Sequence, residues 1–173
     1  KELKQVSELL RQSPERDKLM QRGRELCAHT FVFDHPWDME RCLTPHTMET
    51  MDWNQVFNDD EEWTFMLNRM DYWSALAKAA LISQDTRYLD QAKDFLLDWI
   101  EQHPRIEPSL STRTLDTGIR VVNMLECAML LEASEKLNDE ELTLILTSVE
   151  NQLAYLKANY IEKYTLSNWG SIQ

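Results

Sequence analysis

Apolar residues recur every three or four positions through most of this chain, which is the spacing expected for one face of an α-helix. The stretch 85–102 is the clearest case, because at this spacing it carries Leu89, Ala92, Phe95, Leu96, Trp99 and Ile100. The same pattern predicts further helices, over residues 2–12, 14–27, 59–83, 112–134 and 139–160.

Two segments lack this pattern. Residues 29–58 contain scattered aromatic, histidine and proline residues without a regular period. We expect a long ordered connection there, with one short helix near residues 46–56. Residues 165–173 are expected to form a non-helical tail. An irregular connection as long as 29–58 inside a compact domain is often functional.

The order of these helices predicts one all-α domain spanning residues 1–173, with about two-thirds of its residues helical and little or no sheet. Short turns between consecutive helices favour antiparallel helical hairpins. No repeated signature with a period of about 34 or 40 residues is present, so hairpins winding around a centre could form either an α-solenoid or an α/α toroid. The chain has only 3 glycines and 5 prolines, which argues against a β-sandwich with its frequent turns.

The charge of the chain narrows the possible partners. The formal net charge is -12, and charged residues make up 28% of the sequence. An acidic surface repels the phosphates of nucleic acid and of anionic membranes, so we expect neither as a partner. No run of about 18 apolar residues is present, so no transmembrane helix is expected. The first residues do not resemble a signal peptide, which leaves the cellular compartment open.

The sequence predicts neither a metal site nor an organic cofactor. The cysteines Cys27, Cys42 and Cys127 are odd in number and widely spaced, which is typical of free thiols. The 4 histidines show no metal-ligand spacing. Motifs for phosphate loops, dinucleotides and serine nucleophiles are absent.

Polar and aromatic residues gather near the middle of the predicted helix 59–83. Asn68 and Tyr72 lie one helical turn apart, as do Arg69 and Trp73. Aromatic faces stack on sugar rings, and Arg and Asn side chains bind hydroxyls and carboxylates, so these residues are candidates for carbohydrate binding. The alternative is an arginine whose stem covers a tryptophan-rich core.

A second polar set lies on the predicted helix 112–134. Arg113, Asp116, Arg120 and Asn123 are separated by three, four and three positions, which places them on one helix face. Asp116 and Arg120 have the spacing of an ion pair along a helix. These residues are candidates for binding an acidic ligand, and the alternative is a solvated helix face.

Three segments of the chain, taken in order, resemble the heparinase II/III-like polysaccharide lyases. Residues 62–69 resemble the E-W-x-F-x-L-N-R segment of that family. Residues 113–123 resemble its R-x-x-D-x-G-x-R-x-x-N segment, and residues 166–170 resemble the stretch that precedes its Asn-His motif. One departure is Met70, which stands where the family often has a histidine.

The resemblance implies the N-terminal, incomplete α/α toroid of a lyase, normally followed by a large β-sandwich region. It implies β-elimination in uronic-acid polysaccharides such as glycosaminoglycans or alginate, with an Asn neutralising the carboxylate and Tyr and His serving as base and acid. On this basis Asn168 is the candidate catalytic residue. The candidate substrate-binding residues are Asn68, Arg69, Tyr72, Trp73, Arg113, Arg120 and Trp169.

The expected partners are an acidic polysaccharide or oligosaccharide and the β-sandwich region of the same protein. The family's catalytic Tyr and His would follow Gln173, so this chain is expected to cradle the substrate and to be inactive alone. We expect Arg69, Arg113, Arg120 and Asn168 to lie on one concave side.

Two other interpretations remain open. A toroid glycoside hydrolase would need paired carboxylates in a cleft. A helical protein-interaction scaffold would not bring the Arg, Asn and Trp side chains together.

Overall fold

The computed structural model describes residues 2–33, 42–57 and 59–159. Within these residues the elements are, in chain order, α1 (Glu2–Gln12), α2 (Arg16–Cys27), β1 (Thr30–Phe33), β2 (Cys42–Thr47), α3 (Glu61–Arg69), α4 (Trp73–Ser83), α5 (Arg87–Gln102), the short 3-10 helix η1 (Leu110–Thr112), α6 (Thr114–Ala133) and α7 (Asp139–Ala158). Helix accounts for 68% of the described structure, which confirms the prediction of a mostly helical domain.

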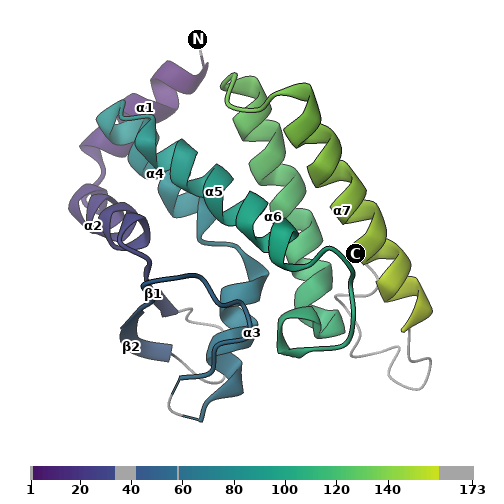
Figure 1. Cartoon of the computed structure of the whole chain (residues 1–173). Helices are drawn as coiled ribbons and strands as arrows, with labels where there is room; N and C mark the ends of the chain where they lie inside the picture. Colours follow the sequence, from purple (N-terminus) through teal and green to yellow (C-terminus); the bar gives the residue numbers. More distant parts are fainter. Residues whose placement is uncertain (1, 34–41, 58, 160–173) are drawn as a thin grey trace.

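The helices form two groups, which meet at the centre of the domain where α4 and α5 pack against α6 (Figure 1). On one side, α4 packs against α1, α2 and α5. On the other side, α6 and α7 lie next to each other as a helical hairpin, and α6 also packs on α3. The two strands lie beside α3 at one end of the domain.

The sequence predicts an ordered connection over residues 29–58, but β1 and β2 pair there as a small two-stranded antiparallel sheet, so the domain is mostly helical and not purely all-α. The predicted helix near residues 46–56 is absent as well, because β2 ends at residue 47 and turns follow. The side chains of Phe31 and Phe33 are 0% and 2% exposed, and both rings pack against Trp63. A strand places alternate residues on the same face, so this short segment buries both phenylalanines in the core as a strand.

The predicted helix 59–83 is wrong in one respect, because the structure divides it into α3 and α4. α3 begins at a capping residue, since the Asp60 side chain accepts a hydrogen bond from the backbone N–H of Glu62 at 3.0 Å. It ends at Arg69, and Met70 then adopts a left-handed conformation with φ 57°. α4 starts at Trp73 in a new direction.

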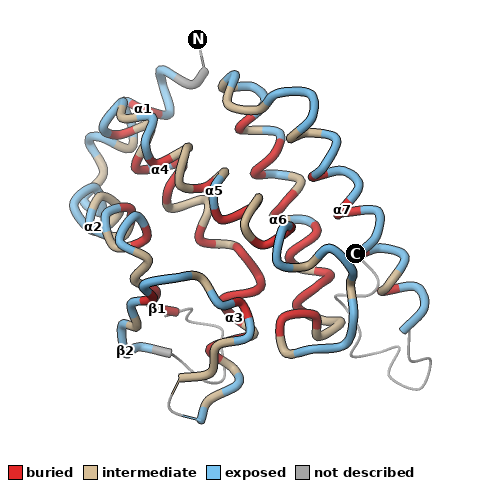
Figure 2. Tube along the Cα trace, viewed as in Figure 1, coloured by how far each residue is buried: buried red, intermediate tan, exposed pale blue. Residues whose placement is uncertain are grey.

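The core is rich in aromatic side chains and runs along the inner faces of α3, α4, α5 and α6 (Figure 2). Its buried aromatic members are Phe31, Phe33, Trp53, Trp63, Tyr72, Tyr88, Phe95 and Trp99. The predicted inner face of α5 is confirmed, since its buried residues include Ala92, Phe95, Leu96, Trp99 and Ile100.

α2 and α4 approach each other closely at Gly23. A Cβ atom added at this glycine would lie 2.6 Å from the Cβ of Ala79 and 3.0 Å from a ring carbon of Tyr88. The absence of a side chain therefore allows these two helices to pack. Within the described residues, no helix is both long and apolar enough to cross a membrane.

Candidate functional site

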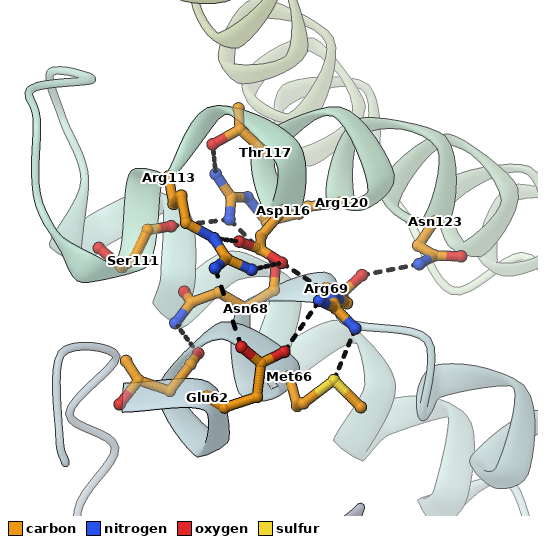
Figure 3. A network of polar contacts seen from close by, with 11 residues as sticks. Glu62, Met66, Asn68, Arg69, Ser111, Arg113, Asp116, Thr117, Arg120 and Asn123 are labelled. Atoms are coloured by element: carbon orange, nitrogen blue, oxygen red, sulfur yellow. Dashed lines mark hydrogen bonds and ion pairs between the residues drawn. The ribbon is translucent and has the colours of Figure 1, made fainter. Parts of the chain in front are cut away.

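Asp116 lies at the centre of a polar network between α3 and α6 (Figure 3). Its side chain is 0% exposed and accepts hydrogen bonds from Nε of Arg69, at 2.7 Å, and from Arg113. Glu62 completes the group, because its carboxylate lies 3.3 Å from Arg69 and 3.8 Å from Arg113. Two guanidinium groups thus alternate with two carboxylates, and their formal charges cancel.

The ends of two helices bring these charges together. Arg69 is the last residue of α3, where the helix dipole favours a cation, and Asp116 lies in the first turn of α6, where the dipole favours an anion. Because α3 packs on α6, the two side chains meet between the helices. Helix geometry and ion pairing therefore favour the same arrangement.

Arg120 lies one turn further along α6 and has no exposed surface. Its donors reach four oxygen atoms at 2.8–3.0 Å, on Gln152, Asn68, Ser111 and Thr117. Its guanidinium carbon also lies 4.1 Å from the centre of the Trp99 ring. Burial lowers the pKa of Arg120 to about 9, so the group remains charged at neutral pH.

The carbonyl groups at the end of α3 are capped by side chains of α6. The backbone oxygen of Asn68 accepts from Arg120 at 3.0 Å, and that of Arg69 accepts from the Asn123 amide at 2.7 Å. A helix end leaves such carbonyls without intrahelical partners. These two donors replace the hydrogen bonds that a continuous helix would have made, which explains the break at Met70.

The Asn68 side chain connects three parts of the chain. Its Nδ2 donates to the carbonyl oxygens of Trp53, at 2.7 Å, and Thr64, at 2.8 Å. Its Oδ1 accepts from the Trp99 indole at 3.0 Å. The amide is 0% exposed, so it fixes the irregular segment before α3 to both α3 and α5.

Tyr72 and Trp73 begin α4 beside a cavity of about 10 Å³ that Asn123 also lines. A cavity of this volume is at the lower limit of what can hold one water molecule. The Tyr72 hydroxyl is buried without a hydrogen-bond partner among the described residues. Burial raises the pKa of Tyr72 well above its ordinary value of 10.0, so its phenol stays neutral. Trp73 is half-buried.

The amino-acid sequence matches one known protein family. The family model described as "Heparinase II/III N-terminus" matches residues 6–173, which includes both helices of the polar network. The chain belongs to this heparinase II/III N-terminal family. No curated protein and no solved structure matches the chain.

Family membership confirms the resemblance carried by residues 62–69 and 113–123. It relates the chain to polysaccharide lyases. In this heparinase II/III N-terminal domain, the two motif segments are the parts of α3 and α6 that form the network around Asp116.

The network brings together several of the candidate substrate-binding residues, but it places most of them in the interior. Arg69 and Arg113 share Asp116, and Arg120 donates to the residue next to Arg69. The alternative of a solvated stripe on α6 is wrong, because Asp116 and Arg120 are 0% exposed. Asn68, Arg69 and Tyr72 are buried as well.

Two of the described candidates keep exposed surface. The Arg113 side chain is 35% exposed, and its guanidinium carbon lies 3.5 Å from the centre of the Phe65 ring. Trp73 is also partly exposed. Asn168 and Trp169 lie outside the described residues. The assignment of all these residues to substrate binding or catalysis stays a prediction.

Sequence reasoning did not select Gln152 and Ser111, although both bind Arg120. Gln152 had a detectable signal, because this polar residue falls between Val149 and Leu156 on the apolar face of α7. A buried polar group needs a partner, so its position indicated a contact across the helix pair. Ser111 gave no such signal, since it lies in a short turn of proline and serine residues. Among the described residues, no three His, Cys, Asp or Glu side chains form a group that could hold a metal ion.

Proposed function

We propose that this domain binds an acidic polysaccharide or oligosaccharide and positions it for cleavage by β-elimination. The observation that carries the proposal is the family match, which extends over residues 6–173. Members of a polysaccharide lyase family act on chains that contain uronic acids, and the N-terminal helical part would cradle such a chain. We propose further that the helical hairpins belong to an incomplete α/α toroid that meets a β-sandwich region.

β-Elimination needs three chemical contributions. A base removes the proton next to the uronate carboxylate, the released electron pair forms the C4–C5 double bond, and the C4–O bond breaks. An acid then protonates the leaving oxygen. The negative charge that develops spreads onto the carboxylate, so a neutralising group there lowers the barrier. We propose the Asn168 amide for this role, with Trp169 beside it in the sequence as a stacking surface, and a Tyr and a His of the complete lyase as base and acid.

Arg113 is the described residue best suited to contact an acidic sugar. Its guanidinium is partly exposed, while Asp116 and the Phe65 ring hold its orientation. A guanidinium whose geometry is already fixed loses little side-chain freedom when it binds a carboxylate or sulfate. The buried residues Arg69, Asp116 and Arg120 then act as its support, and Trp73 is a second exposed contact.

The overall negative charge of the chain does not prevent this contact. At physiological ionic strength, charges further than about 8 Å away are largely screened. A direct ion pair between Arg113 and a ligand is screened much less, so the net charge of -12 does not by itself decide binding.

The test measures binding of defined heparan sulfate and alginate oligosaccharides to the protein by calorimetry. Replacing Arg113 with Gln is expected to weaken binding at least about tenfold, since one charge-assisted hydrogen bond contributes roughly 1.5–3 kcal/mol. The matched control is Arg87→Gln, because Arg87 is 85% exposed at the start of α5 and carries the same charge. Equal losses in both variants would assign the binding to net charge alone, and unchanged affinity in Arg113→Gln would contradict the proposed contact.

A further inference from the structure

A hollow of about 600 Å³ lies between α5, α7 and the residues that follow α5. Its apolar lining is Leu97 and Ile100 on α5 and Leu144 on α7, and Thr147, Ser148 and Asn151 line the rest of the α7 wall. Leu144 is 47% exposed, so a large apolar side chain faces solvent at this place. We call this hollow the α5–α7 groove.

The rim of the α5–α7 groove carries negative charge. Glu101, Glu140 and Glu141 line it. Glu141 is paired with Lys93 at 3.0 Å, whereas Glu101 and Glu140 make no side-chain hydrogen bond or ion pair within the described part of the chain. No Lys or Arg is among the lining residues. The remaining titratable group, His103, has its pKa lowered by burial, so it adds no positive charge at neutral pH.

The dimensions of the groove fit a helix. Its α7 wall extends from Glu140 to Asn151, 11 positions apart. At 1.5 Å per residue this wall is about 16 Å long, which is about three turns of a helix lying alongside. The walls are themselves helices, so a partner helix can pack on them as helices pack on one another.

We propose that the α5–α7 groove binds a basic amphipathic helix of a partner protein. Its apolar face would cover Leu97, Ile100 and Leu144, and its Lys or Arg residues would lie beside Glu101 and Glu140. Helices of this kind bind grooves through apolar residues at spacings of three, four and seven. The acidic rim repels an anionic sugar chain, so this surface is separate from the proposed polysaccharide contact at Arg113.

The test uses a fluorescein-labelled helical peptide of about 14 residues, with leucines on one face and lysines on the other. Leu144→Glu is compared with Leu153→Glu, since both leucines are on α7 and are 47% and 48% exposed. Only Leu144 lines the groove. Each substitution adds one negative charge to α7, so any unspecific attraction of the peptide's lysines is the same in both variants.

Fluorescence anisotropy is expected to show about tenfold weaker binding for Leu144→Glu, because one leucine contact is lost, and no loss for Leu153→Glu. Circular dichroism checks that both variants are folded. A double variant with Glu101→Gln and Glu140→Gln is expected to bind more weakly and with a smaller salt dependence. Equal affinity of the two leucine variants for the peptide would overturn the proposal. Unchanged affinity and unchanged salt dependence in the double glutamate variant would overturn it as well.

Discussion

Replacing Asp116 with Asn removes one charge from the interior while keeping the shape of the side chain. Asp116 is 0% exposed and lies 2.7 Å from Arg69, whose side chain is 8% exposed. Removing one partner of a buried ion pair costs roughly 3–5 kcal/mol, because the other charge is left without compensation. Arg69 keeps Glu62 at 3.3 Å, so we expect the lower end of this range, about 3 kcal/mol. Arg113 adds little, since its side chain is 35% exposed and partly screened by solvent.

The free energy of unfolding is measured by urea denaturation followed by circular dichroism. A loss of about 3 kcal/mol corresponds to a fall in Tm of roughly 6–12 °C for a domain of this size. The control is Asp17→Asn, which breaks an exposed ion pair, since the side chains of Asp17 and Arg16 are 91% and 51% exposed. Only a small loss is expected, because exposed ion pairs contribute little and Asp17 adds a modest interaction with the α2 dipole. A loss below about 1 kcal/mol in Asp116→Asn would refute the assignment of a buried, charge-compensating role.

A second variant separates lost charge compensation from lost packing. Replacing Arg69 with Met in the Asp116→Asn background removes the uncompensated cation. Substituting both partners of a buried pair is much less costly than substituting one. The double variant is therefore expected to regain part of the lost stability. If the double variant is instead clearly less stable than Asp116→Asn alone, the packing of Arg69, and not its charge, dominates at this position.

Two further predictions concern helix packing and pH. Gly23→Ala is expected to destabilise the domain by about 1–3 kcal/mol in urea denaturation through the close contact with Ala79, and adding Ala79→Gly should restore part of the loss; a more stable single variant would contradict this. Burial lowers the pKa of His103 below its ordinary value of 6.5. As the pH falls from 7, His103 is therefore protonated in the unfolded chain before it is protonated in the folded chain. The unfolded state is favoured by this proton uptake, so the stabilisation by His103 is lost as the pH falls through the lowered pKa. The difference in unfolding free energy between wild type and His103→Gln should therefore shrink from pH 7 to pH 5, and a constant difference would exclude this titration.

The periodicity of apolar residues located most of the helices correctly, because each helix buries one stripe. It could not locate the break after Arg69, since the chain has neither Gly nor Pro there. The break depends on donors from Arg120 and Asn123, which lie 52 and 54 positions away in the sequence. The apolar pattern also did not predict β1. This strand has four residues, with Phe31 and Phe33 on one face, and four residues are too few to distinguish a strand from a helix.

The sequence predicted which residues form the candidate site but not that most of them are buried. The spacing of Asp116 and Arg120 correctly placed both on one face of a helix. Spacing alone does not tell which element covers that face. In the structure, the cover is the end of α3, whose carbonyl groups accept from α6, so the polar face is buried. Arg113, at the start of α6, keeps 35% of its side chain exposed, and Asn123 is half-buried.

The break between α3 and α4 has a consequence for folding during synthesis, because the ribosome releases α3 and α4 before α6. A nascent chain that has emerged only through α5 contains Met70 but neither of the α6 side chains, Arg120 and Asn123, that cap α3. Its local preference is one continuous helix over residues 59–83, as the apolar pattern indicates. We expect α6 to convert this helix into two when it docks, so that part of the native structure forms by unwinding. Hydrogen exchange in a chain ending before Arg113 should then show amide protection continuing through Met70, and an unprotected turn there would exclude this sequence of events.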